Sequence, residues 1–556
     1  MDRIRFGGLS SGIDTHEMVH QLMQVERMRV DRFVKRDTRV EWRQEAMNDL
    51  NRKLAHSVLD MRRHFGLEQV SYDGRFRSSS VSRFDWVKAA RSSDSDVTKA
   101  TASAEAMNGV HQVNVTELAK VGRISSLNLN DVSWEIGEGE EAQTVNLLEE
   151  PGGSQFSSQA RGKTISFKLA GDEETVHTFT IGDGAEQNGT SVNDLVRFIN
   201  AASSEEAGTG LHAAFDRDLG QIMMATRQTG ADQGFTFVTD ASDTDNITSL
   251  VFDLDELEDN AVAGSDAQLT FNGQAVTKST NDFSIFGINL SLQALGEATV
   301  NVSTDVDSVV DKVKGFVQQY NELLDDLDQQ LNENYYDDYP PLTDEQKSVM
   351  SDRDIEQWEE RSRSGLLNRD EGITRMIQRL RSGLYEKVEG LTGSYNQMTQ
   401  IGITTGSYQE GGRLVVDEDR LRNAIANDVD GVMGLMFQTS GDEDPGTKRS
   451  ESGLIQRMND DIVTAMKDLV RRGGAGEDGS LYRSVQGNML VDFVTRQSGI
   501  STLQRERMDL NRRIAREEQI LLQKEESYWQ RFTAMEKAMG QMASQADWLM
   551  AQMNQF

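Results

Sequence analysis

The segment from Thr15 to Phe65 contains neither proline nor glycine, and this feature constrains the fold more than any other. Asp14 stands at an N-cap position, and Glu17 three residues later completes the pattern of a capping box. Apolar side chains recur at seven-residue steps along one predicted helix face: Phe33, Val40, Met47, Leu54 and Met61. A continuous helix here would be roughly 75 Å long, which is too long for an ordinary globular core. The sequence leaves open whether this helix is continuous.

The C-terminal end of the chain carries a similar repeat. One row of seven-residue steps contains Ile514, Leu521, Tyr528, Met535, Met542, Leu549 and Phe556, and a second contains Phe532, Met539, Ala546 and Met553. Sustained heptads predict a helix over 505–556 that packs along another helix, most simply the helix within 1–45. A core helix of a globular domain fits less well, because the apolar stripe continues to the last residue.

The middle of the chain has a different character. From 78 to 302 the sequence alternates with period two between frequent turns, as in "TISFKLAG" and "AQLTFNGQAV", which predicts antiparallel β structure. We expect an inner β part over 78–160 and 262–302, and an outer part over 161–261. Helical spacing returns over 303–504 and is interrupted near 335–370; together with 46–77 this region predicts a mainly helical domain. The predicted fold is α+β and multidomain, with antiparallel β domains inserted between paired terminal coiled-coil helices.

Composition narrows the function classes. A formal net charge of -33 argues against nucleic-acid binding through the bulk surface. The absence of cysteine excludes disulfides and thiolate metal sites. No apolar run is long enough for a membrane helix, and the opening residues lack the apolar stretch of a cleaved signal peptide. If the protein leaves the cell, we expect it to use another route.

Two short motifs suggest enzymes but lack their context. His16–His20 reads H-E-x-x-H, the zinc-protease pattern. A third ligand is missing, because His56 and His64 would lie more than about 50 Å away along the same helix. Gly8–Gly12 reads G-x-S-x-G, but no buried strand precedes it as a nucleophile elbow requires. We therefore expect no catalytic residue, no cofactor and no metal, with zinc kept as a residual alternative.

Several segments, in order along nearly the whole chain, resemble one known family. "GLSSGIDTHEMVHQLMQVERMRVDRF" resembles the opening of the flagellar filament-capping proteins (flagellar hook-associated protein 2, the FliD family). "GVHQVNVTELAKVGRISS" is similar to the family's first β segment, and "FTIGDGAEQNGTSVNDLVRFINAA" resembles a repeat shared with flagellins. "IGITTGSYQEGGRLVVDEDRL" and "ESYWQRFTAMEKAMGQMASQADWLMAQMNQF" resemble its C-terminal half. The segment 335–370 looks like an insertion found in some members.

The resemblance implies a structural function. In this family the terminal helices pair as a leg, the β domains form a plate, and a small ring of subunits, often five, caps the filament outside the cell. The implied partners are flagellin, hook–filament junction proteins, other copies of the chain and a cytoplasmic export chaperone. Subunits of this family pass unfolded through the flagellar export apparatus, which fits the expected lack of a cleaved signal peptide. Membrane insertion is not expected.

We expect the leg residues to form the partner interface, first pairing within the chain and then docking filament subunits. The predicted interface residues are Met18, Leu22, Val25, Phe33, Val40, Tyr528, Phe532, Met535, Met539, Met542, Leu549, Met553 and Phe556. Two alternatives stay open: another flagellar axial protein, such as a hook–filament junction protein, and a surface adhesin whose β domains bind host mucus or glycans.

Overall fold

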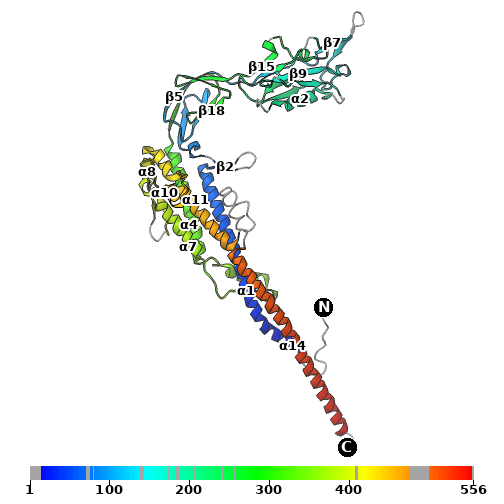
Figure 1. Cartoon of the computed structure of the whole chain (residues 1–556), viewed down its shortest axis with the longest axis vertical. Helices are drawn as coiled ribbons and strands as arrows, with labels where there is room; N and C mark the ends of the chain where they lie inside the picture. The colour runs from blue at the N-terminus through cyan, green and yellow to red at the C-terminus, as the bar shows by residue number, and fades with distance from the viewer. Residues whose placement is uncertain are drawn as a thin grey trace. The chain divides into compact units, whose positions relative to one another are not determined.

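The computed structural model describes residues 14–70, 76–78, 80–136, 143–172, 174–182, 188–204, 208–239, 242–255, 257–406, 411–474 and 500–553. The chain divides into two units, of which one contains residues 1–81 and 306–556 and the other contains residues 82–305. The first unit is mainly helical and the second mainly β (Figure 1). The predicted α+β class, with β domains inserted between packed terminal helices, is confirmed.

The helical unit is built from both ends of the chain. Its helices are α1 (Thr15–Phe65), α4 (Val306–Asn332), α5 (Asp344–Ser348), α6 (Asp352–Arg363), α7 (Glu371–Tyr385), α8 (Glu418–Asn427), α9 (Val429–Phe437), α10 (Pro445–Glu451), α11 (Leu454–Gly473) and α14 (Thr502–Met553). Two small antiparallel hairpins join them, formed by β1 (Glu68–Val70) with β2 (Phe76–Ser78) and by β21 (Ile403–Thr405) with β22 (Leu414–Val416).

Helix α1 is one continuous helix of 51 residues, which answers the question that the sequence left open. Asp14 accepts a hydrogen bond from the backbone N–H of Glu17 at 3.0 Å, as an N-cap residue does. The Glu17 carboxylate accepts from the Gln21 amide at 2.8 Å. Gly66 ends the helix in the left-handed conformation, with φ of 76°.

The second half of α1 lies in the core of the helical unit. Four of the five heptad positions predicted on it are buried: Val40, Met47, Leu54 and Met61. Phe65 at its end packs edge-on against Phe437 of α9, with ring centroids 4.8 Å apart. Contacts with α4 and α11 cover this half of the helix, which explains why so long a helix is stable.

The side chain of Asp370 links helices α1, α7 and α11 of the helical unit. It caps α7 by accepting hydrogen bonds from the backbone N–H groups of Gly372 (2.8 Å) and Ile373 (3.2 Å). Its carboxylate also pairs with Arg472 of α11 at 2.9 Å and with Arg43 of α1 at 3.2 Å. Burial by itself raises the pKa of Asp370, but the hydrogen bonds and charge of Arg472 and the two backbone donors outweigh it, so that the net pKa is lowered.

We expect Asp370→Asn to destabilise the protein at neutral pH by about 2 kcal/mol, because Arg472 and Arg43 lose their shared anion. The lowered pKa sets the pH window. The contribution is fully present above the ordinary pKa of 3.8 and is lost as the pH falls through the lower value of the folded state. Denaturant unfolding of both proteins between pH 7 and pH 2 would measure this. Glu371→Gln, at the exposed neighbouring residue, is the control, and an equal loss in that variant would contradict the assignment.

The β unit contains two groups of sheets. The inner group is a five-stranded sheet of order β17-β16-β5-β20-β3 and a three-stranded sheet of order β18-β19-β4. Their strands are β3 (Lys88–Ser92), β4 (Thr98–Ala102), β5 (Gly109–Glu117), β16 (Ala267–Phe271), β17 (Gln274–Lys278), β18 (Asp282–Ile285), β19 (Ile288–Leu292) and β20 (Gly296–Thr304). All of the strand pairs in both sheets are antiparallel, as the alternating sequence predicts.

The outer group has two four-stranded sheets, of order β10-β9-β14-β15 and β11-β12-β13-β6, and the hairpin β7-β8. Its strands are β6 (Arg123–Ser125), β7 (Ser133–Ile136), β8 (Gln143–Asn146), β9 (Thr164–Leu169), β10 (His177–Thr180), β11 (Ser203–Ser204), β12 (Thr209–Asp216), β13 (Gln221–Thr226), β14 (Gly234–Phe237) and β15 (Ala261–Ala263). The helices α2 (Val192–Ala201) and α3 (Thr248–Val251) pack with them. Ser191 and Asp194 form a capping box at the start of α2.

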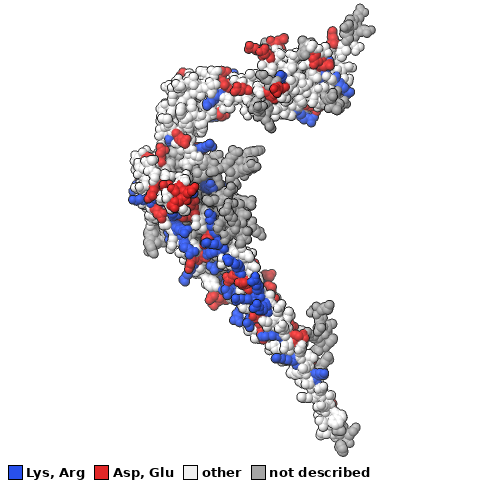
Figure 2. Space-filling view, in the orientation of Figure 1, with Lys and Arg blue, Asp and Glu red and all other residues white. Residues whose placement is uncertain are grey.

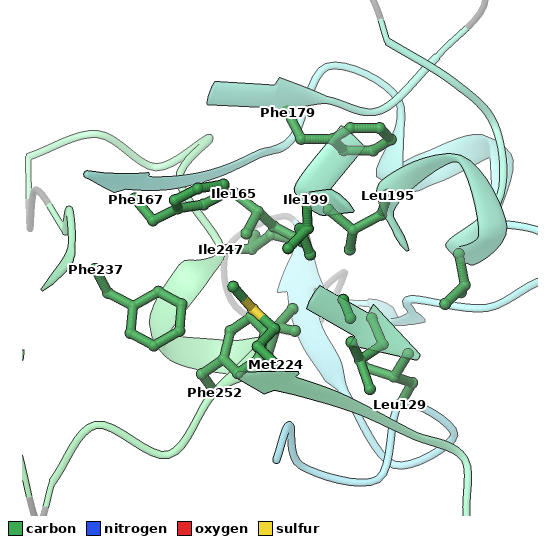
Figure 3. Packing of buried hydrophobic residues seen from close by; sticks show 14 of the residues in the cluster. Leu129, Ile165, Phe167, Phe179, Leu195, Ile199, Met224, Phe237, Ile247 and Phe252 are labelled. Atoms are coloured by element: carbon green, nitrogen blue, oxygen red, sulfur yellow. The ribbon is translucent and has the colours of Figure 1, made fainter. Parts of the chain in front are cut away.

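Each group of strands encloses its own hydrophobic core. The outer core is rich in aromatic and branched side chains, among them Phe167, Phe179, Phe237 and Phe252 (Figure 3). It also takes in Leu129, Leu147 and Phe156, although the sequence suggests that residues up to 160 belong to the inner part. The difference has a physical reason: β6 pairs with β13, and short alternating strands do not reveal which core they join until they pair.

Candidate docking surface on the terminal helices

Helices α1 and α14 lie side by side and run in opposite directions (Figure 1). Ion pairs along their contact define the register: Arg29 with Glu517 at 3.2 Å, and Arg36 with Glu506 at 2.8 Å. Glu26 accepts hydrogen bonds from Lys524 and Tyr528, and the Lys524 ammonium lowers the pKa of that carboxyl. Each pair is partly exposed and contributes little by itself, but together they select one alignment of the two helices.

The side of α1 that faces α14 differs by one residue from the predicted stripe. Val19 is only 3% exposed and Val30 is also buried, whereas Val25 is 62% exposed. Met18 and Leu22 lie on the exposed side with Val25. Successive residues of a helix are rotated by about 100°, so a shift of one position moves the contact to a neighbouring face. Helix α1 therefore carries two apolar stripes, of which one packs on α14.

A groove lies between the two helices near the start of α1. It has a volume of about 470 Å³ and is lined by a mixture of apolar and charged or polar side chains. Val19 and Met23 of α1 line it together with Leu521, Leu522 and Trp529 of α14. The Trp529 ring packs edge-on against His16, with centroids 5.7 Å apart. The groove is wide enough for an apolar side chain of a partner helix, which is one common way in which helices are recognised.

Beyond Trp529, helix α14 extends past the start of α1 at Thr15 (Figure 1). This part of the helix is about 35 Å long, and its end lies past the first residue of α1. Large apolar side chains are exposed along it: Met535, Met542, Trp548, Leu549, Met550 and Met553. Leu549, for example, is 54% exposed. Exposed apolar side chains at this density are typical of a surface that binds a partner.

The predicted interface residues thus fall into four groups. Met18, Leu22, Val25, Met535, Met542, Leu549 and Met553 are exposed; Phe33, Tyr528, Phe532 and Met539 are partly buried; Val40 is buried; and Phe556 lies outside the described residues. Sequence periodicity missed Val19, Val30 and Trp529 as the residues at which α1 and α14 meet. The opposite charges of Glu26 and Lys524 could have indicated the register, but only after the antiparallel pairing was assumed.

The segment 335–370 packs on α1, which the sequence did not predict. Arg363 pairs with Glu45 at 3.0 Å and stacks over the buried Trp42 ring at 4.4 Å. Nearer the groove, Glu345 of α5 pairs with Arg27 at 3.5 Å and also lines the groove. The segment therefore supports α1 from one side. Such support matters because long helices tend to bend.

The two histidines of the H-E-x-x-H motif, His16 and His20, line the groove between α1 and α14. Among the described residues, no group of three His, Asp or Glu residues could hold a metal ion. The G-x-S-x-G motif at 8–12 lies outside those residues. The described helices also include none that is long and apolar enough to cross a membrane.

Comparisons with known proteins agree on one family. The family model "Flagellar hook-associated protein 2 C-terminus" matches residues 264–544, and the corresponding N-terminus model matches residues 11–121. A flagellar hook-associated protein 2 from Halalkalibacterium halodurans is 30% identical, over 98% of both chains. The B-type protein from Pseudomonas aeruginosa is 24% identical, over 77% of this chain and 76% of the relative. The crystal structure of the Escherichia coli flagellar cap protein FliD, domains D1 to D3, matches 76% of this chain and 96% of its own, with 19% identity and a TM-score of 0.45.

The sequence matches include a relative of nearly the same length as this chain, and both halves of the family model are present in the right order. The family is one of structural flagellar proteins and not of enzymes, which agrees with the interpretation of the H-E-x-x-H and G-x-S-x-G motifs. The chain therefore belongs to the flagellar hook-associated protein 2 (FliD) family, the proteins that cap the filament of the bacterial flagellum.

Proposed function

We propose that the chain forms an oligomeric ring at the outer tip of the filament, where it promotes the folding and insertion of exported flagellin and prevents its loss. The observation that carries this proposal is the end of α14, where apolar side chains extend beyond the partner helix. A helix face of this kind buries its apolar area only when a partner covers it. We infer that flagellin, or a hook–filament junction protein before the filament grows, supplies that partner.

The mechanism would be steric and would need no chemistry. The leg, formed by α1 and α14, would dock filament subunits, while the β domains would form the plate that encloses the site of insertion. The interface would use the exposed members of the predicted set, with Met18, Leu22 and Val25 on α1 and the methionine-rich row on α14. Methionine side chains adapt to differently shaped partners, which suits a cap that must shift each time a subunit is added.

The export route is also part of the proposal. The chain would reach the tip unfolded through the flagellar export apparatus, after a cytoplasmic chaperone has covered its apolar segments. Its lack of cysteine is compatible with this route, because no disulfide would have to form after export.

Deletion of the gene tests the proposed function. We expect cells that bear hooks without filaments and release abundant soluble flagellin into the medium, because no cap would retain the exported subunits. Flagellin in the culture supernatant and on the cell surface would be measured, with the gene restored in trans as the control. Filaments of normal length on the deletion strain would contradict the proposal.

Adhesion is a second candidate function for the β unit, and it could coexist with capping. The two β domains have their own cores and place several sheet faces at the surface, which is compatible with a ligand-binding module. Binding of mucin or glycans by the full chain, competed by an excess of free glycan, would support it.

A further inference from the structure

A strained aromatic residue stands at the tip of one hairpin in the inner β domain. Strands β18 and β19 are joined by the two-residue turn Phe286–Gly287, in which φ is 49° and 78°. Turns with two positive φ values favour Asn, Asp or Gly at the first position, because a bulky side chain is strained there. The hairpin of β16 and β17 turns in the same way at Asn272–Gly273, with φ of 49° and 82°, and it uses the favoured Asn. Phe286 is therefore an unfavourable choice for the fold.

Burial does not compensate for the strain at Phe286. The side chain is 69% exposed, and its ring makes only a tilted contact with Phe271, with centroids 6.1 Å apart. The turn itself is held firmly, since the backbone N–H of Ser103 donates to the Gly287 carbonyl at 2.8 Å. Close by, Met107 follows Ala106, against which the turn packs, and is also exposed. Backbone strain that does not stabilise the fold is often found at residues with a functional role.

The surroundings of the tip lack charge in a strongly acidic unit. Residues 82–305 contain 35 Asp or Glu and 13 Lys or Arg, so two copies of this unit repel each other over most of their surface. By contrast, residues 283–296 and 106–116 contain no Asp, Glu, Lys or Arg. Figure 2 shows a largely uncharged surface over β5 and β18. Copies of the chain can therefore approach here without electrostatic cost.

A second apolar surface lies on the outer β domain. It is formed by exposed side chains on and beside the edge strand β6: Leu127, Met223 and Leu250. They are neighbours, because Met223 pairs with Ser125 across the sheet and the N–H of Leu127 donates to the Val251 carbonyl at 2.8 Å. A closed ring with more than two members needs two different surfaces on each copy, one for each neighbour. The β unit supplies two such surfaces.

We propose that Phe286 is an anchor through which one copy of the chain binds the Leu127–Met223–Leu250 surface of the next copy in the ring. The inference rests on the proposed function, since it names the contact that the ring would use. An exposed aromatic side chain on a rigid support is the residue type that most often dominates an interface. The strain at the turn is then retained because Asn, which suits the fold better, would not fill the neighbour's apolar surface.

Phe286→Asn in the full chain separates the effect on the turn from the effect on the contact between copies, because Asn is the residue that the equivalent turn of β16 and β17 already uses. We expect the β unit to unfold at an equal or higher temperature than in the wild type. We also expect the concentration at which half of the chains assemble to rise at least about tenfold. Differential scanning calorimetry and sedimentation velocity would measure these quantities. Phe286→Tyr should assemble like the wild type, and so should Leu295→Asn, which changes an exposed leucine between β19 and β20.

Each contrary outcome has a definite meaning. If wild type and Phe286→Asn assemble equally, the assignment of Phe286 as the anchor is wrong, but the proposed ring is not contradicted. If Phe286→Asn leaves assembly unchanged and alters the unfolding of the helical unit, the aromatic ring serves a contact within one chain, and the proposal is overturned. If the wild-type chain stays monomeric at every concentration, both the anchor and the proposed ring fail.

Discussion

Cells that carry Leu549→Asp are expected to lose their filaments and release flagellin into the medium, as the gene deletion does. Leu549 is exposed near the end of α14, so the substitution removes little packing among the residues that the structure describes. A carboxylate in the centre of an apolar docking surface would have to be desolvated without a partner, which is costly. The expected effect is therefore on docking and not on folding.

Ser544→Asp is the matched control for this variant. Ser544 is exposed on the same part of α14, and helical spacing places it on the face opposite Leu549. Both purified variants should unfold within about 0.5 kcal/mol of the wild type, since both positions are at the surface. Electron microscopy of the cells and the flagellin content of the medium would report the difference. Normal filaments with Leu549→Asp, or equal loss with both variants, would contradict a specific apolar face.

Arg457→Met is expected to lower the stability of the helical unit by about 3–5 kcal/mol. Arg457 of α11 is only 1% exposed, and its guanidinium donates hydrogen bonds to five backbone carbonyls. These carbonyls lie in or just beyond the last turns of α7 and α10: Gly383, Glu386, Lys387, Arg449 and Ser450. A single side chain thus satisfies two helix ends and places its positive charge at both dipole termini.

Methionine fills a similar volume but donates no hydrogen bond, so the carbonyls would remain buried without partners. For a unit of this size the expected loss corresponds to a fall of roughly 4–7 °C in the unfolding midpoint. Circular dichroism at helical wavelengths would record it. The unfolding midpoint of Arg457→Lys should lie between those of the wild type and Arg457→Met, because lysine keeps the charge but not the planar guanidinium group. Arg471→Ala, at an exposed arginine of the same helix, should change little, and an equal loss there would refute the role assigned to Arg457.

The candidate site was only partly predictable from the sequence. The heptad rows correctly indicated two long terminal helices that pack together, because the spacing of apolar residues on a helix depends on local geometry alone. The partners of particular residues were harder to predict. Met18 and Val19 are adjacent and both apolar, as are Leu22 and Met23, so either stripe could have faced α14. The contact of Glu345 with Arg27 joins residues from distant parts of the sequence, and no local pattern indicates it.

The sequence by itself determined that long helices occupy both ends of the chain, the order of helix, β and helix, and the family to which the chain belongs. These depend on caps, on the absence of helix breakers and on periodicities of 3.6 and 2, which neighbouring residues set. Only the tertiary structure decided that α1 is continuous, that Val19 and Val30 face α14, that the end of α14 extends past the first residue of α1, and that residues 123–136 and 143–160 join the outer core. These outcomes depend on which distant segments pack together. Similar apolar faces are alternative partners for the same segment, and packing and charge together select one arrangement.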